Sequence, residues 1–194
     1  VGILQDDVST LQDDVSTLQT LQDDVSTLQD DVSTLQDDVS NLKNRIWDVI
    51  IEDQKPSGTN GGTFSSGAWI TRNLNTLVYN HDSLASLSNN RFTLPAGTYC
   101  IDWDAPGYQV TFHKTLLYNY TKSSIVAYGT SEVSDASGNP AQSRSFGTSI
   151  ITIDQQTQFE IRHRCSSSRS DYGLGRLTGF GTEIYTRVRI KKIS

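Results

Sequence analysis

The chain has 194 residues, of which 35% are hydrophobic, and its formal net charge is −6. It contains no run of about 18 apolar residues, which excludes a membrane-spanning helix, and we expect no membrane insertion. The acidity lies at one end, because residues 1–41 contain ten Asp and no Lys or Arg, whereas residues 42–194 carry +4. Because the chain starts at Val1 and contains no Met, we expect it to be part of a longer protein.

The first segment repeats the heptad LQDDVST almost without variation. Leu and Val alternate at spacings of three and four residues from Leu4 to Val49, with one three-residue insertion before Leu21. A strict repeat of 3.5 residues is useful only when another helix follows the same supercoil. The sequence therefore predicts a parallel coiled-coil stalk over residues 1–53. Val at the a position with Leu at d favours dimers, so this seam alone does not distinguish a trimer from a dimer.

The repeat places Asp at two positions of every heptad and offers no cation to pair with them. Parallel helices then bring carboxylates close together, and we expect this repulsion to weaken the stalk at neutral pH. After Leu42, the apolar residues Trp47, Ile50 and Ile51 fall outside the seam. We expect this end of the helix to pack beneath the next domain.

A segment rich in Gly, Ser and Asn, residues 54–62, breaks the helical pattern and is predicted to be a linker. From residue 63 to 194 the chain shows short β-type runs separated by turn residues, which is typical of a sandwich or barrel. No helix-period segment is present there. The predicted strands are AWITR, TLVYN, RFTL, TYCIDWD, YQVTFHKTLLY, SIVAYG, FGTSIITID, TQFEIRHRC and EIYTRVRIKKI.

Two cysteines permit one disulfide, but strand parity argues against it. Cys100 alternates away from Tyr99, Ile101 and Trp103, whereas Cys165 shares the face of its own apolar neighbours. The two side chains then meet different surroundings, and we expect free thiols.

The order of coiled coil, Gly-rich linker and β-rich head resembles the trimeric head domains of viral, bacteriophage and bacterial fibre proteins. Those heads look like the complement globular head and the tumour-necrosis-factor jelly roll. The resemblance implies an all-β jelly-roll sandwich head of ten strands, a homotrimer about the stalk axis, and a role in attachment. The motifs that carry it are GTFSSGAWITRNLNT, FTLPAGTYCIDWDAPGY, HKTLLYN, RSFGTSIITI, FEIRHRC and FGTEIYTRVRIKKI.

The residues that carry chemistry do not form a recognisable catalytic or metal motif. None of the three His lies in a GxSxG-type motif, and no CxxC, HExxH or calcium-loop pattern occurs. For His163 a packed, hydrogen-bonded core position is favoured over a catalytic base. Asp102 and Asp104 share a strand face, where a solvated or salt-bridged surface near the basic C-terminal strand is favoured over a cation site or glycosidase pair. We therefore expect no catalytic residue, metal or cofactor.

The basic C-terminal strand lacks an aromatic stacking platform, so a nucleic-acid partner is not expected. Loops rich in Tyr, Arg and Ser on a rigid β scaffold are good contact surfaces. One such loop is CSSSRSDYGLGRLTGFGTE, and a second candidate segment surrounds HKTLLYN. The predicted ligand-binding residues are Tyr108, His113, Tyr118, Arg169, Asp171, Tyr172 and Arg176.

These features together favour a trimeric fibre tip that binds a cell-surface receptor or glycan. The expected location is extracellular, on a virion, a phage tail or a bacterial surface fibre. Two alternatives stay open. One is a secreted signalling ligand of the tumour-necrosis-factor or complement type, and the other is a fibre-bound polysaccharide hydrolase, which needs paired carboxylates in a cleft.

Overall fold

A computed structural model describes residues 2–44, 46–135 and 140–194. The chain divides into two compact units, residues 1–46 and residues 47–194, which we describe separately and call the stalk and the head. None of the helices in the described ranges combines the length and the apolar composition that a membrane span requires.

The stalk is one helix, α1 (Gly2–Asn44), as the heptads predict. Its repeated Leu and Val side chains form an exposed stripe in the single chain: Leu11 is 62% exposed, Val15 54% and Leu28 62%. A stripe of large apolar side chains at this spacing is stable in water only when another helix covers it. The coiled coil itself stays a prediction.

The predicted continuation of the stalk helix to residue 53 is wrong. Helix α1 ends at Asn44, and residues Val49–Lys55 form strand β1 of the head. Val49 fits the heptad, but it lies between two strands, paired with Ile190 on one side and with Asn80 on the other. Burial of Val49 and Ile51 inside the head outweighs the helical period here. The predicted linker 54–62 therefore lies within the head.

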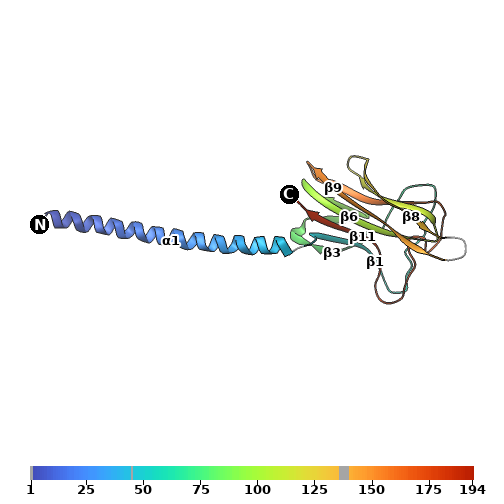
Figure 1. The fold of residues 1–194 in the computed structure, drawn as a ribbon, viewed down its shortest axis with the longest axis horizontal. Coiled ribbons are helices and arrows are strands. Elements are labelled where there is room, and N and C mark those ends of the chain that lie inside the picture. Colours follow the sequence, from blue (N-terminus) through green and yellow to red (C-terminus); the bar gives the residue numbers. More distant parts are fainter. Residues whose placement is uncertain (1, 45, 136–139) are drawn as a thin grey trace. The chain divides into compact units, whose positions relative to one another are not determined.

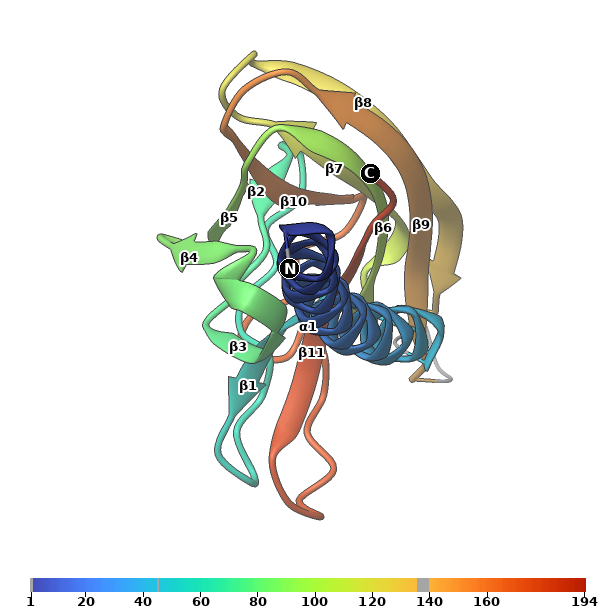
Figure 2. The ribbon, with the colours of Figure 1, turned by 90° about the vertical axis from the view of Figure 1, so that its left-hand side faces the viewer.

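The head is a sandwich of two antiparallel sheets (Figures 1 and 2). Sheet 1 has the order β3-β1-β11-β6-β9, and sheet 2 has the order β4-β5-β10-β7-β8, with the short strand β2 paired to β10. The strands after β1 are β2 (Ile70–Thr71), β3 (Thr76–Asn80), β4 (Ser86–Ser88), β5 (Arg91–Leu94), β6 (Gly97–Tyr108), β7 (Thr111–Asn119), β8 (Ser124–Ser134), β9 (Gln142–Ile153), β10 (Thr157–Cys165) and β11 (Glu183–Lys192), and a 3-10 turn, η1 (His81–Ser83), follows β3.

The chain crosses repeatedly between the sheets. Strands β6, β9 and β11 lie in sheet 1, whereas β7, β8 and β10 lie in sheet 2, and of these strands only β7 and β8 follow each other within one sheet. This crossing pattern is that of a jelly roll. Within the described residues ten strands lie on the two sheet paths, as the resemblance implied, and β2 lies beside them. The predicted jelly-roll sandwich is confirmed by this strand order.

The main core lies between the sheets and is built by strand alternation. Tyr99, Ile101 and Trp103 of β6 are buried against Phe159 and Ile161 of β10. The intervening residues of β6 therefore face outward from sheet 1. The prediction of free thiols is confirmed, since Cys100 lies on that partly exposed face and Cys165 is buried in a separate, smaller cluster with Phe64, Val110 and Leu174.

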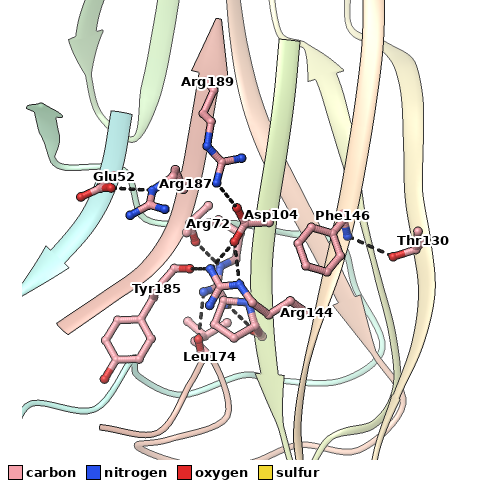
Figure 3. Close-up of polar contacts among 12 residues, drawn as sticks. Glu52, Arg72, Asp104, Thr130, Arg144, Phe146, Leu174, Tyr185, Arg187 and Arg189 are labelled. Carbon is pink, nitrogen blue, oxygen red and sulfur yellow. Dashed lines mark hydrogen bonds and ion pairs between the residues drawn. The ribbon is translucent and has the colours of Figure 1, made fainter. Parts of the chain in front are cut away.

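One charged side chain is part of the interior. Arg72 is fully buried, and its guanidinium donates to Thr186 Oγ1 at 2.8 Å, to the Leu174 carbonyl at 2.9 Å and to the Pro106 carbonyl at 3.4 Å (Figure 3). Burial lowers the pKa of Arg72 to about 10, although the nearby Asp53 carboxylate acts to raise it. This side chain therefore ties the segment after β2 to β6, to β11 and to the loop before β11.

Candidate ligand-binding site

A groove of about 550 Å³ opens on the outer face of sheet 2, between β7, β8, β10 and residues 66–69. This volume lies in the range of small-molecule binding sites. Alternation along β7 explains how the groove is built, because His113 and Thr115 point inward and are buried, whereas Phe112 points outward. The side chains that dominate its lining are Trp69, Phe112, Lys114, Glu132, Val133 and Arg164.

The walls of the groove are aromatic and apolar. Phe112 and Val133 are paired across β7 and β8 and are 63% and 59% exposed. The ring of Trp69 lies 6.2 Å from that of Tyr128 on β8, at an interplanar angle of 43°. Lys114 Nζ lies 5.6 Å from the centre of the Tyr128 ring, within cation–π distance. The groove thus offers flat apolar surfaces beside a positive charge.

His113 forms the floor of the groove and belongs to a buried hydrogen-bonded chain. Its Nδ1 lies 2.9 Å from His163 Nε2, and its Nε2 lies 2.8 Å from Ser143 Oγ. Burial lowers the pKa of His113 to about 4, with Arg72 acting in the same direction and Glu132 against it. Both imidazoles are therefore neutral at physiological pH. The expected core position of His163 is confirmed, since this side chain is wholly buried and its ring centre lies 4.6 Å from that of Phe64.

The hydrogen-bonded side chains follow the order Ser143, His113, His163, which is the order of a nucleophile, a base and an orienting group. A catalytic triad needs an orienting carboxylate that stabilises the imidazolium as it forms. Here the third member is a neutral imidazole, and its Nδ1 has no hydrogen-bond partner. Ser143 also does not line the groove. This arrangement fits a structural role, and the absence of catalysis stays a prediction.

Three of the predicted ligand-binding residues come together at the end of β6. The rings of Tyr108 and Tyr172 lie edge to face with centres 5.5 Å apart. Arg176 covers both rings, at 5.4 and 5.8 Å, and its Nη1 donates to Tyr108 Oη at 3.2 Å. We call these three residues the loop cluster. Because Arg176 is exposed, the loop cluster is a second candidate contact surface.

Two other predicted residues hold the same loop in place. Arg169 pairs through its backbone with Phe64, and its Nε donates to the Gln109 carbonyl at 2.8 Å. Asp171 accepts a hydrogen bond from Asn60 Nδ2 at 2.6 Å. These contacts fix the loop to the segment that follows β1, so Arg169 and Asp171 position the loop cluster.

Tyr118 lies apart from both surfaces, on the outer face of sheet 2. The guanidinium of Arg162 stacks 3.4 Å above its ring, and Arg91 stacks 3.5 Å above Tyr120 in the same way. Both guanidiniums donate to the buried carboxylate of Glu160, at 2.6 and 2.8 Å. Burial acts to raise the pKa of Glu160, but these two hydrogen bonds and the charges behind them lower it overall. Both cations are thus paired with one carboxylate within the chain.

The sequence pattern missed most of the groove. Trp69, Lys114 and Arg164 were not among the predicted residues, and of the groove lining only His113 was. A weak signal was present in FEIRHRC, where charged residues alternate with apolar ones and so share the outer face of one strand. Phe180 was also missed; it is 95% exposed in the loop before β11, where the Glu183 carboxylate accepts backbone N–H groups from Thr178 and Gly179.

The outer face of sheet 1 carries an ion network (Figure 3). Asp104 is paired with Arg144 and Arg189, and Glu52 is paired with Arg187. Asp102 accepts a hydrogen bond from Thr148 at 2.7 Å. The favoured interpretation of a salt-bridged position is confirmed for Asp104, and Asp102 is a partly exposed hydrogen-bonded residue of the same strand face. Among the residues that the structure describes, no group of three His, Cys, Asp or Glu is placed to hold a metal ion.

No family model matches the sequence, and no curated protein matches it. Among solved structures, the chain is similar to the globular domain of zebrafish complement 1qA protein, with 10% identity over 75% of this chain and 98% of that one, at a TM-score of 0.45. It is also similar to murine APRIL in the crystal structure at pH 8.5, with 9% identity over 74% of this chain and 98% of that one, at a TM-score of 0.46. The fold assignment rests on the strand order, and the candidate site rests on its own residues.

Proposed function

We propose that this chain is a homotrimeric attachment protein of an extracellular fibre, whose heads bind a cell-surface glycan or receptor. The observation that carries the proposal is the groove on sheet 2, which joins aromatic walls to unpaired charge on a rigid β scaffold. Grooves of this size with a few placed polar groups are the usual sites of ligand recognition. The stalk then supplies reach and valency.

Self-association is supported by apolar surface that a single chain leaves uncovered. The stripe on α1 is one such surface. The head adds another, since Phe146 and Ile150 on β9, at the edge of sheet 1, are 53% and 68% exposed. Light scattering on the whole chain should give three times the chain mass of 21.5 kDa. A mass of two chains would mean that the Val/Leu seam sets the oligomer, and a monomer would contradict the proposal.

Three heads on one fibre change how strong each contact must be. Linked sites that meet a repetitive surface raise apparent affinity by roughly 10²–10⁴ without any new contact. We therefore expect weak binding by one head and strong retention by the oligomer. The stalk repeats one polar heptad and offers no distinctive contact surface, so the binding residues should lie in the head.

The test compares the whole chain with residues 47–194 alone, on a glycan array and a panel of intact cells. The whole chain should be retained, the head alone should bind the same targets more weakly, and residues 1–46 should not bind. A Tyr172→Ala, Arg176→Ala double variant tests the loop cluster, with Gln156→Ala in an exposed turn as the matched control. Binding by the stalk alone, or no binding by the head to any target, would overturn the proposal.

A further inference from the structure

Two cations face each other across the ladder that forms the groove. Lys114 on β7 and Arg164 on β10 are directly opposite in register, and both line the groove. Directly opposite like charges destabilise an antiparallel pair. In the part of the chain that the structure describes, neither side chain forms an ion pair. An anion placed beside both of them would remove this repulsion.

The same sheet face shows how two cations are paired with a carboxylate when no ligand is needed. Two residues along β10, Arg162 shares the carboxylate of Glu160 with Arg91. That carboxylate is 1% exposed, so both cations are satisfied inside the chain. Among the described residues, no carboxylate is shared in this way by Lys114 and Arg164. The positive charge is therefore concentrated at the groove and not spread over the sheet.

The other groups of the groove narrow the class of anion. Trp69, whose ring packs beside that of Tyr128, and Phe112 present flat apolar surface, which suits the C–H face of a sugar ring better than a small inorganic ion. Glu132 lies on the rim, opposite His113 in the β7–β8 ladder, and brings a negative charge. A carboxylate there accepts hydrogen bonds from hydroxyl groups, but it repels a polymer with a charge on every unit, such as a nucleic acid.

We propose that the groove between β7, β8 and β10 binds an anionic saccharide. Lys114 and Arg164 hold its carboxylate or sulfate group, the wall formed by Trp69 and Phe112 packs against its sugar ring, and Glu132 accepts hydrogen bonds from its hydroxyl groups. This inference rests on the proposed attachment function and names the ligand class of its site.

The experiment uses the whole chain on an array that carries uronic-acid, sialic-acid, sulfated and uncharged saccharides. We expect binding to at least one carboxylated or sulfated class, at least tenfold weaker binding to its uncharged counterpart, and loss of binding as salt is raised. The carboxylated and sulfated arms distinguish the two sources of negative charge. Equal binding to charged and uncharged saccharides would overturn the inference.

Four variants of the whole chain test the residues one at a time. Arg164→Gln and Trp69→Ala should each weaken binding by about tenfold or more. Glu132→Gln should shift the preference from singly charged toward heavily sulfated saccharides, because an amide oxygen is a weaker acceptor for hydroxyl groups than a carboxylate and because the change removes a repulsive charge. Lys122→Gln is the matched control, since Lys122 pairs with Asp154 outside the groove and should change nothing.

The outcomes separate this inference from the proposed function. If the head still binds cells or glycans while Arg164→Gln and Trp69→Ala bind like the parent chain, the anionic-saccharide site is wrong and attachment through another surface survives. If the loop-cluster variant alone loses binding, the site is the loop cluster. If the head binds no target at all, both proposals fail. Circular dichroism and thermal melting of each variant show that a loss of binding is not a loss of folding.

Discussion

Acid should destabilise the head through its two buried histidines. His113 is 4% exposed and His163 is wholly buried, and each is hydrogen-bonded to the other as a neutral imidazole. Burial lowers the pKa of His113 to about 4. Burial also lowers the pKa of His163 well below its usual value, and the charge of Arg72 acts in the same direction. Neither site therefore accepts a proton readily while the head is folded.

The sign and size of the stability change follow from the difference in the pKa of His113 between the folded and unfolded states. The unfolded chain takes up a proton on His113 near pH 6.5, whereas the folded head does so only near pH 4. As pH falls below 6.5 the unfolded state binds more protons, so the free energy of unfolding falls until about pH 4. A shift of this size corresponds to about 3 kcal/mol for His113. His163 adds to the loss in the same direction.

The assay is denaturant unfolding of residues 47–194 at several pH values between 7 and 4.5. The parent head should lose stability across this window, whereas His113→Gln should lose clearly less. Because His113→Gln also removes a hydrogen bond to Ser143, the readout is the slope against pH and not the absolute stability. The difference between the two slopes also cancels the titration of carboxyl groups. Parallel pH profiles for the parent and the variant would refute the reasoning.

Three further predictions concern charge in other parts of the chain. Arg72→Met should lower the free energy of unfolding by about 1–3 kcal/mol for each buried acceptor that it leaves unpaired, Thr186 Oγ1 and the Leu174 carbonyl; chemical denaturation measures this, with Lys122→Met, at a surface pair with Asp154, as a control within about 0.5 kcal/mol. Lys114→Glu should raise head stability by about 0.2–1 kcal/mol by creating an opposite-charge cross-strand pair, while it abolishes anion binding; a less stable head would contradict this register argument. A peptide of residues 1–46 should melt at higher temperature at pH 4 than at pH 7, because acid removes repulsion between Asp side chains; an unchanged or lower melting temperature would contradict the electrostatic account.

Local periodicity was sufficient to predict most of the elements. All nine predicted β runs contain a strand of the structure, and the heptads produce one helix. Strand parity also placed Cys100 and Cys165 correctly, because alternation depends only on neighbouring residues. The wrong prediction of helix at residues 49–53 has a physical cause, since Val49, Ile50 and Ile51 fit both a heptad and a buried strand. Pairing with β3 and β11, which lie far along the chain, decided between the two patterns.

The site was harder to predict because it depends on register. Composition alone selected the loop that carries Tyr172 and Arg176, and the fold brings both to Tyr108. Composition did not reveal the groove, because its charge arises from Lys114 and Arg164, which are ordinary outward-facing residues on separate strands. Only their direct opposition across β7 and β10 makes them unusual.

Strand β10 contains one cation that is paired with a carboxylate and another that lies opposite a like charge, and this contrast supports the proposed binding site. Glu160 and Arg162 neutralise each other within the sheet, whereas Arg164, two residues further on, meets another cation. A sequence selected for stability alone would place a carboxylate at one of the two positions. Local rules of this kind are broken most often where function requires it, because the cost of the repulsion is recovered when a ligand binds. The like-charge pair is therefore better evidence for the ligand's charge than the total charge of the chain, which the acidic stalk dominates.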